Sequence, residues 1–96
     1  MEHQERIDEL RSIKDSKERL SALLDFVFDI RRFDAEQAIT LCDEIINEAE
    51  QYQDKLALGR AHNHKGFCYA LRSEYQLGIA SLDKARRLAV EVRNDG

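Results

Sequence analysis

The residues of this sequence that could hold a metal ion are two histidines and a cysteine in one segment. His62 and His64 are two positions apart, and side chains at that spacing point to nearly opposite sides of a helix. His64 and Cys68 are four apart and share a face, but a zinc site needs three or four ligands and no nearby residue completes the set. The sequence therefore predicts no metal site, and a polar His64 beside a packed Cys68 is the preferred interpretation.

Two carboxylates have the spacing of a catalytic pair. Asp25 and Asp29 are one helical turn apart, and paired carboxylates carry out acid–base catalysis in hydrolases and hold metals in helical bundles. Arg32 lies on the same line and is expected to neutralise one of them, which favours a solvated stripe of ion pairs. The chain has no glycine-rich phosphate loop, serine elbow or metalloprotease helix. We expect no enzyme and no cofactor, with a small helical-bundle enzyme that uses Asp25 and Asp29 as the least favoured hypothesis.

The thiols and the polarity of the chain suggest a cytoplasmic protein. Cys42 and Cys68 both fall inside expected helices, are too few for a disulfide framework, and are expected to pack as small apolar groups. Neither has a neighbouring base that would make it a nucleophile. No signal peptide or membrane-length apolar run is present, so a cytoplasmic location and no membrane partner are expected.

The composition predicts a single all-helical domain. The chain has 96 residues, of which 43% are hydrophobic and 35% are charged, with no proline and only four glycines. A net charge of −4 argues against nucleic acid as a partner. The last helix does carry a basic cluster, but cations late in a helix also complement its dipole.

Five helices are expected to position these groups, over about residues 2–14, 17–32, 35–51, 55–71 and 74–93. Asp15 and Ser16 both offer N-cap oxygens for the helix at 17–32, and Asp34 and Asp54 are the N-cap candidates of the next two helices, with Gln37 completing a capping box with Asp34. The helix at 17–32 is apolar around most of its circumference, so it must be covered on several sides.

An internal repeat groups these helices into pairs. A shift of 40 residues places inward-facing small or medium apolar residues on one another: Ala38 on Gly78, Cys42 on Leu82, Ile45 on Ala85, and Ala49 on Ala89. The first helices of the two pairs match less well. We therefore expect a leading helix at 1–16, a first degenerate pair at 17–53 and a second pair at 54–96.

The second pair resembles the tetratricopeptide repeat (TPR) family. Gly66 and Tyr69 match its motif outright, whereas His62, Lys65, Gly78, Leu82 and Ala85 stand at its other motif positions. The family's proline is missing, and the period is 40 residues where the family has about 34. The resemblance implies an all-α, TPR-like α-solenoid of stacked antiparallel helix pairs.

The linkers resemble those of sensory TPR arrays that precede a diguanylate cyclase, histidine kinase or nucleotide cyclase in bacterial signalling proteins. The matching segments are FDAEQA at 33–38 and AEQYQD at 49–54. This resemblance implies a scaffold for protein binding: the N-terminal sensory or oligomerisation module of a larger signal-transduction protein. The alternative is a stand-alone helical adaptor that binds a peptide.

The resemblance also implies a concave groove for a protein or peptide partner. The corresponding positions on the helix at 55–71 are Arg60, Asn63, His64, Phe67 and Leu71, and those on the helix at 17–32 include Leu23 and Val27. The second set has a competing role, which the sequence favours. Ile7, Leu10 and Ile13 of the leading helix need an apolar surface to pack on, and Leu20, Leu23, Val27 and Ile30 would provide it.

The last helix has more apolar residues than one neighbour can cover. Ile79, Leu82, Leu88 and Val92 cannot all face the preceding helix, so they are expected to form an open edge. Either further repeats beyond Gly96 or a second copy of the chain would cover this edge. We expect a homodimer.

Overall fold

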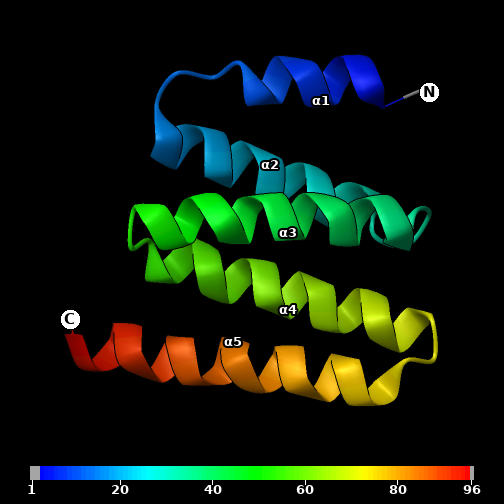
Figure 1. The fold of residues 1–96 in the computed structure, drawn as a ribbon, viewed down its shortest axis with the longest axis vertical. Helices are drawn as coiled ribbons and strands as arrows, with labels where there is room; N and C mark the ends of the chain where they lie inside the picture. The colour runs from blue at the N-terminus through cyan, green and yellow to red at the C-terminus, as the bar shows by residue number, and fades with distance from the viewer. Residues whose placement is uncertain (1–2, 96) are drawn as a thin grey trace.

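The computed structural model describes residues 3–95 and contains five helices, with no strand among those residues. They are α1 (Gln4–Arg11), α2 (Ser16–Ile30), α3 (Ala35–Gln51), α4 (Lys55–Leu71) and α5 (Tyr75–Asp95), as Figure 1 shows. The all-α prediction is confirmed, and α3 and α4 have the expected bounds at both ends. The leading helix is shorter than expected, so Ile13 lies beyond its end.

The three aspartates expected to cap helices do so. Each side chain accepts a backbone N–H bond, from Glu18 to Asp15 at 2.9 Å, from Gln37 to Asp34 at 3.1 Å and from Ala57 to Asp54 at 3.0 Å. The capping box at Asp34 is only half formed. The backbone N–H of Asp34 donates to the carbonyl oxygen of Ile30 at 2.8 Å, so it does not need the Gln37 side chain.

The turns after α3 and α4 are built in the same way. Gln53 and Ser73 have left-handed backbone with φ of 54° and 63°. At the second turn Glu74 N–H donates to the Tyr69 carbonyl at 2.8 Å and Ser73 N–H to the Ala70 carbonyl at 3.0 Å, the pattern of a Schellman motif. The first turn has the equivalent bonds, from Asp54 to Ala49 and from Gln53 to Glu50. Both helices therefore end in the same left-handed turn.

Ser73→Gly is expected to raise the free energy of unfolding by about 0.5–1 kcal/mol, because a left-handed residue with a Cβ is strained where glycine is not. Urea denaturation of both proteins measures the change. Ser21→Gly is the matched control, since it places glycine inside α2 and should lower the stability. A loss of stability in Ser73→Gly would contradict the assignment of strain to this turn.

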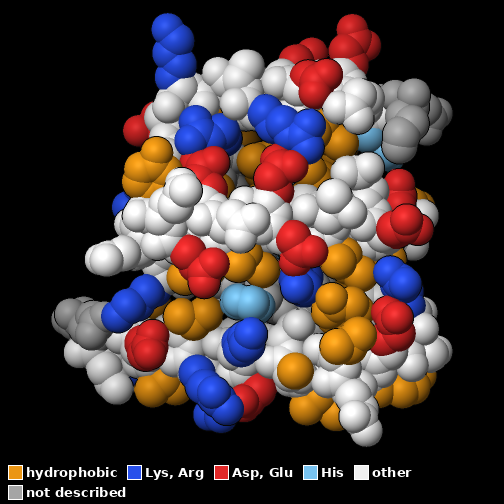
Figure 2. Space-filling view, viewed as in Figure 1, with side chains coloured by type: hydrophobic (Ala, Val, Ile, Leu, Met, Phe, Trp, Pro, Cys, Tyr) orange, Lys and Arg blue, Asp and Glu red, His pale blue; other side chains and the backbone are white. Residues whose placement is uncertain are grey.

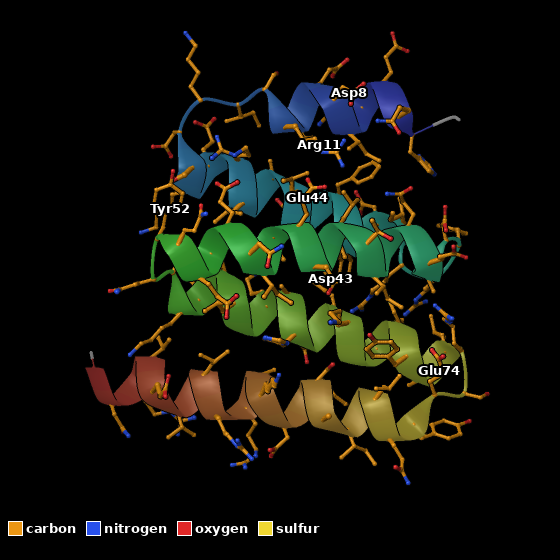
Figure 3. The ribbon with its side chains drawn as sticks, viewed as in Figure 1. Asp8, Arg11, Asp43, Glu44, Tyr52 and Glu74 are labelled. Atoms are coloured by element: carbon orange, nitrogen blue, oxygen red, sulfur yellow. The ribbon has the colours of Figure 1, made fainter. Side chains whose placement is uncertain are left out.

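The core lies around α2, which is covered from several sides. Its buried residues are Leu20, Leu23, Leu24, Val27 and Ile30. They belong to one apolar cluster with Ile7 and Leu10 of α1 and Leu41, Cys42 and Ile45 of α3. The Arg11 guanidinium of α1 also donates to both carboxylate oxygens of Glu44 on α3, at 2.9 and 2.7 Å, and Figure 3 shows the two side chains facing each other. The leading helix is therefore docked over the first helix pair.

The helices α4 and α5 occupy unequal places in the stack. Of the described helices, α4 packs against α2, α3 and α5, whereas α5 packs against α4 alone. The α4–α5 contact is close at Gly66 and Gly78, where a Cβ added to Gly78 would lie 3.1 Å from the Gly66 carbonyl oxygen. One long side of α5 is therefore packed closely, and the others have no helix beside them.

Candidate functional site

A groove with a volume of about 540 Å³ lies between α4 and α5. Most of its floor is apolar. The residues that line it are Lys55, Leu56, Gly59, Arg60 and Asn63 of α4 and Leu82, Ala85, Arg86, Leu88, Ala89 and Val92 of α5. Because Leu56 is 61% and Leu82 42% exposed, the groove holds uncovered apolar surface.

The shape of this α4/α5 groove follows from the spacing of residues on the two helices. Gly78 and Ser81 are buried in the α4 contact. The neighbouring line of α5, formed by Leu82, Ala85 and Ala89, turns toward the hollow at intervals of three and four residues. On the other wall Gly59 has no side chain, and a Cβ there would lie in ordinary contact with Leu88, 3.6 Å away. Small residues on both helices therefore keep the hollow open.

The rim of the α4/α5 groove is basic. Lys55, Arg60 and Arg86 are among its lining residues, and no Asp or Glu is among them. Arg86 donates to Asp83 at 2.9 Å, and Arg87 lies 2.6 Å from the same carboxylate. The hydrogen bond from Arg86 and the charges of both arginines hold the pKa of Asp83 below its usual value. Two cations therefore share one anion, which leaves a net positive charge beside the groove.

A second cluster joins the end of α2 to α4. The Arg31 guanidinium carbon lies 3.9 Å from the centre of the Phe67 ring and 4.6 Å from that of the Phe28 ring. This one cation therefore contacts an aromatic ring from α4 and another from α2. Its Nη1 lies 3.1 Å from Nδ1 of His64. This cluster was not predicted from the sequence. The spacing of Phe28 and Arg31 was visible, but their contact with α4 depends on how the helices pack.

His64 is held in its neutral form by this environment. The side chain is 7% exposed, and burial, followed by the charges of Arg31 and Arg60, lowers its pKa to about 4. At neutral pH Nδ1 therefore accepts a hydrogen bond from Arg31, which places the ring proton on Nε2. A protonated His64 would face a guanidinium at hydrogen-bonding distance.

Three residues expected in the concave groove, namely Leu23, Val27 and His64, are buried in the structure. Leu23 and Val27 are 2% and 0% exposed, because they pack into the core that also contains Ile7 and Leu10. The competing role that the sequence favoured for these side chains agrees with this burial. His64 is buried as well, whereas Leu71 is 51% exposed.

The remaining expected groove residues are divided between two places. Arg60 and Asn63 line the α4/α5 groove, and Phe67 stacks on Arg31. The expected open edge is also divided. Leu82, Leu88 and Val92 line the same groove, whereas Ile79 lies outside it and is 66% exposed.

Of the candidate catalytic groups, Asp25 is bonded to a cation and the two thiols are buried. Asp25 accepts a hydrogen bond from Arg60 at 3.2 Å, and Arg32, expected to pair with Asp25 or Asp29, instead lies 5.9 Å from the Phe67 ring centre. Burial raises the pKa of the Cys42 thiol to about 12 and also raises that of Cys68, so both are poor nucleophiles. No group of three or more His, Cys, Asp or Glu side chains within residues 3–94 has the arrangement of a metal site.

Two further findings bear on what the chain is. In the part of the chain that the structure describes, every helix is too short or too polar to cross a membrane. Comparison with protein-family models, with curated proteins and with solved structures gives no match.

Proposed function

We propose that this chain is a helical protein-interaction module of the TPR type, acting as the N-terminal sensory or oligomerisation part of a larger bacterial signal-transduction protein. The resemblance of the second helix pair and of the linkers supports the family and the signalling context. The stacking of α4 on both helices of the first pair is consistent with this proposal. The proposal includes no catalytic step.

The observation that carries the proposal is the uncovered apolar surface of α5. This helix packs against α4 alone, and Ile79 and Val90, which share one face because they are eleven positions apart, are 66% and 41% exposed outside the α4/α5 groove. Apolar residues gathered on one helix are typical of surfaces that meet another protein, and stacked helix pairs need a cover on their terminal faces. A second copy of the chain is our proposed cover for the part outside the groove.

Self-association through this surface can be measured directly. Sedimentation equilibrium at micromolar concentration is expected to give twice the chain mass of 11.2 kDa. Ile79→Lys should return the mass to that of one chain, because a charge on an apolar contact must be desolvated. Gln51→Lys, which adds the same charge to an exposed polar position at the end of α3, a helix that does not contact α5, is the control and should remain dimeric. A single-chain mass for the unchanged protein would contradict the dimer.

The alternative function, a stand-alone adaptor for a partner peptide, is favoured by a different observation. The α4/α5 groove is open, apolar at its floor and basic at its rim, which are the features of a surface that receives a segment of another chain. A module could use both surfaces, since Ile79 is outside the groove.

A further inference from the structure

The first helix pair contains a filled equivalent of the α4/α5 groove. Cys42, Ile45 and Ala49 of α3 are almost completely buried, and α3 packs extensively against α4. A shift of 40 residues along the chain leads to Leu82, Ala85 and Ala89 of α5, which line the open groove. The positions that are buried on α3 are therefore uncovered on α5. Since the helix α4 packs on the α3 residues, a helix is the element that fits the equivalent surface of α5.

The dimensions of the groove agree with a helix of modest length. The lining residues extend from Lys55 to Asn63 on α4 and from Leu82 to Val92 on α5. At 1.5 Å per residue these stretches are about 12–15 Å long, which corresponds to about two to three turns of a helix lying along them. The floor residues are small or medium in size, so the bound helix should present alanine and leucine on its buried side, as α4 presents Ala57 and Ala61 to the first pair.

The seam between α3 and α4 is formed by an acidic helix against a basic one. The charged residues of α3 are all acids, namely Glu36, Asp43, Glu44, Glu48 and Glu50. Those of α4 are all bases, namely Lys55, Arg60 and Lys65. The two sets meet where Lys65 Nζ donates to Asp43 Oδ1 at 2.8 Å, and Figure 2 shows carboxylates on both sides of the band that α3 occupies. Opposite charges therefore accompany apolar packing at the filled position.

At the α4/α5 groove, α5 takes the place that α3 has in the first pair, but the charge that it presents is positive where that of α3 is negative. Asp83 lies 40 residues after Asp43, but the two arginines that follow it on α5 neutralise it. The corresponding residues on α3 are Ile46 and Asn47, which carry no charge, so Asp43 stays available for Lys65. A helix that fills the α4/α5 groove must therefore carry acids where α4 carries bases.

We propose that the α4/α5 groove binds an acidic amphipathic helix of a partner protein, in the position that a further helix of the stack would take. The inference rests on the proposed function as an interaction module and names the chemistry of its partner. A second copy of the chain fits the groove less well for two reasons. A two-fold contact would bring the basic rims of two grooves together, and like charges repel. The acidic helix α3, which could otherwise fill the groove of another copy, has its apolar side buried in the core of its own chain. The dimer contact at Ile79 leaves the groove free.

A pair of synthetic peptides tests the charge requirement. The probe is an N-acetylated, C-amidated peptide of about 18 residues, with Leu and Ala on one side of the helix and Glu and Gln elsewhere. Its counterpart has Lys at every Glu position. Fluorescence anisotropy is expected to show the acidic peptide binding at least about tenfold more tightly than the basic one, with the difference shrinking as salt is added.

Two pairs of variants locate the binding on the protein. Arg86→Gln should weaken binding of the acidic peptide by about three- to tenfold, whereas Arg87→Gln should change it by less than about twofold. These arginines are adjacent and share Asp83, but only Arg86 lines the groove. Ala89→Glu, in the groove floor, should abolish binding, whereas Val90→Glu, the adjacent exposed residue outside the groove, should not.

The outcomes separate this inference from the proposed function. Equal binding of both peptides, or equal effects within either pair of variants, overturns the acidic-helix inference and leaves the interaction module in place. If Ala89→Glu converts a dimer to a single chain and Ile79→Lys does not, the groove is occupied by a second copy of the chain. That result also overturns the acidic-helix inference. A single-chain mass together with no binding of either peptide contradicts both proposals.

Discussion

Gly66→Ala is expected to lower the free energy of unfolding by about 1–3 kcal/mol, although alanine is the better helix former. A Cβ at this position would lie 2.6 Å from Cγ of Leu82 and 3.1 Å from the carbonyl oxygen of Gly78. The first atom is near the base of its side chain and the second is backbone, so neither can move aside without moving α5. The cost of separating the helices should exceed the gain of about 1 kcal/mol in helix propensity.

Gly59→Ala is the matched control, because Gly59 also lies on α4 and also faces α5. A Cβ there would make an ordinary contact with Leu88 at 3.6 Å, so the substitution should raise the stability by about 0.5–1 kcal/mol. Urea denaturation of the three proteins gives both changes. If the two alanine variants shift in the same direction, the close approach of α4 and α5 at Gly66 is not what limits the packing.

The local features of this fold could be predicted from the sequence because they depend on neighbouring residues. The caps at Asp15, Asp34 and Asp54 and the bounds of α3 and α4 follow from side chains within a few positions of each helix end. The tight contact of α4 with α5 depends on Gly66 and Gly78, because small residues that face each other across a short turn allow two helices to approach.

The candidate site could be predicted only in part, because it depends on which helix lies against which. The spacing of apolar residues showed that α5 has too many for one neighbour, and Leu82, Leu88 and Val92 do line the open groove. The burial of Leu23 and Val27 agrees with the packing role that the sequence favoured for them over a place in the groove. The spacing could not bring Arg31 to His64 and Phe67, which are more than 30 positions away along the chain. Contacts of that kind are set by helix packing, which a one-dimensional pattern leaves open.

His64 is expected to make the protein less stable as the pH falls from 7 to 4. The folded state holds the pKa of His64 at about 4, against an ordinary value of 6.5, so between these values the unfolded chain binds a proton that the folded chain does not. The stability contributed by neutral His64 is fully present above pH 6.5 and is lost progressively toward pH 4. The total loss from this residue should be about 2–4 kcal/mol. The half-buried His62, whose pKa is also lowered chiefly by burial, acts in the same direction.

Two measurements isolate the contribution of His64 from that of the carboxylates, which titrate at the lower end of the same range. Urea denaturation of His64→Gln should give a free energy of unfolding that depends less on pH between 6.5 and 4, because glutamine does not titrate. A site-resolved NMR titration of the unchanged protein should place the pKa of His64 well below that of an unfolded histidine, and it decides the question even if His64→Gln fails to fold. If His64 titrates near pH 6.5, the folded state does not favour the neutral imidazole, and the hydrogen bond from Arg31 to Nδ1 does not contribute to stability. The contact between the end of α2 and α4 would then depend on the two phenyl rings around Arg31 and not on the histidine.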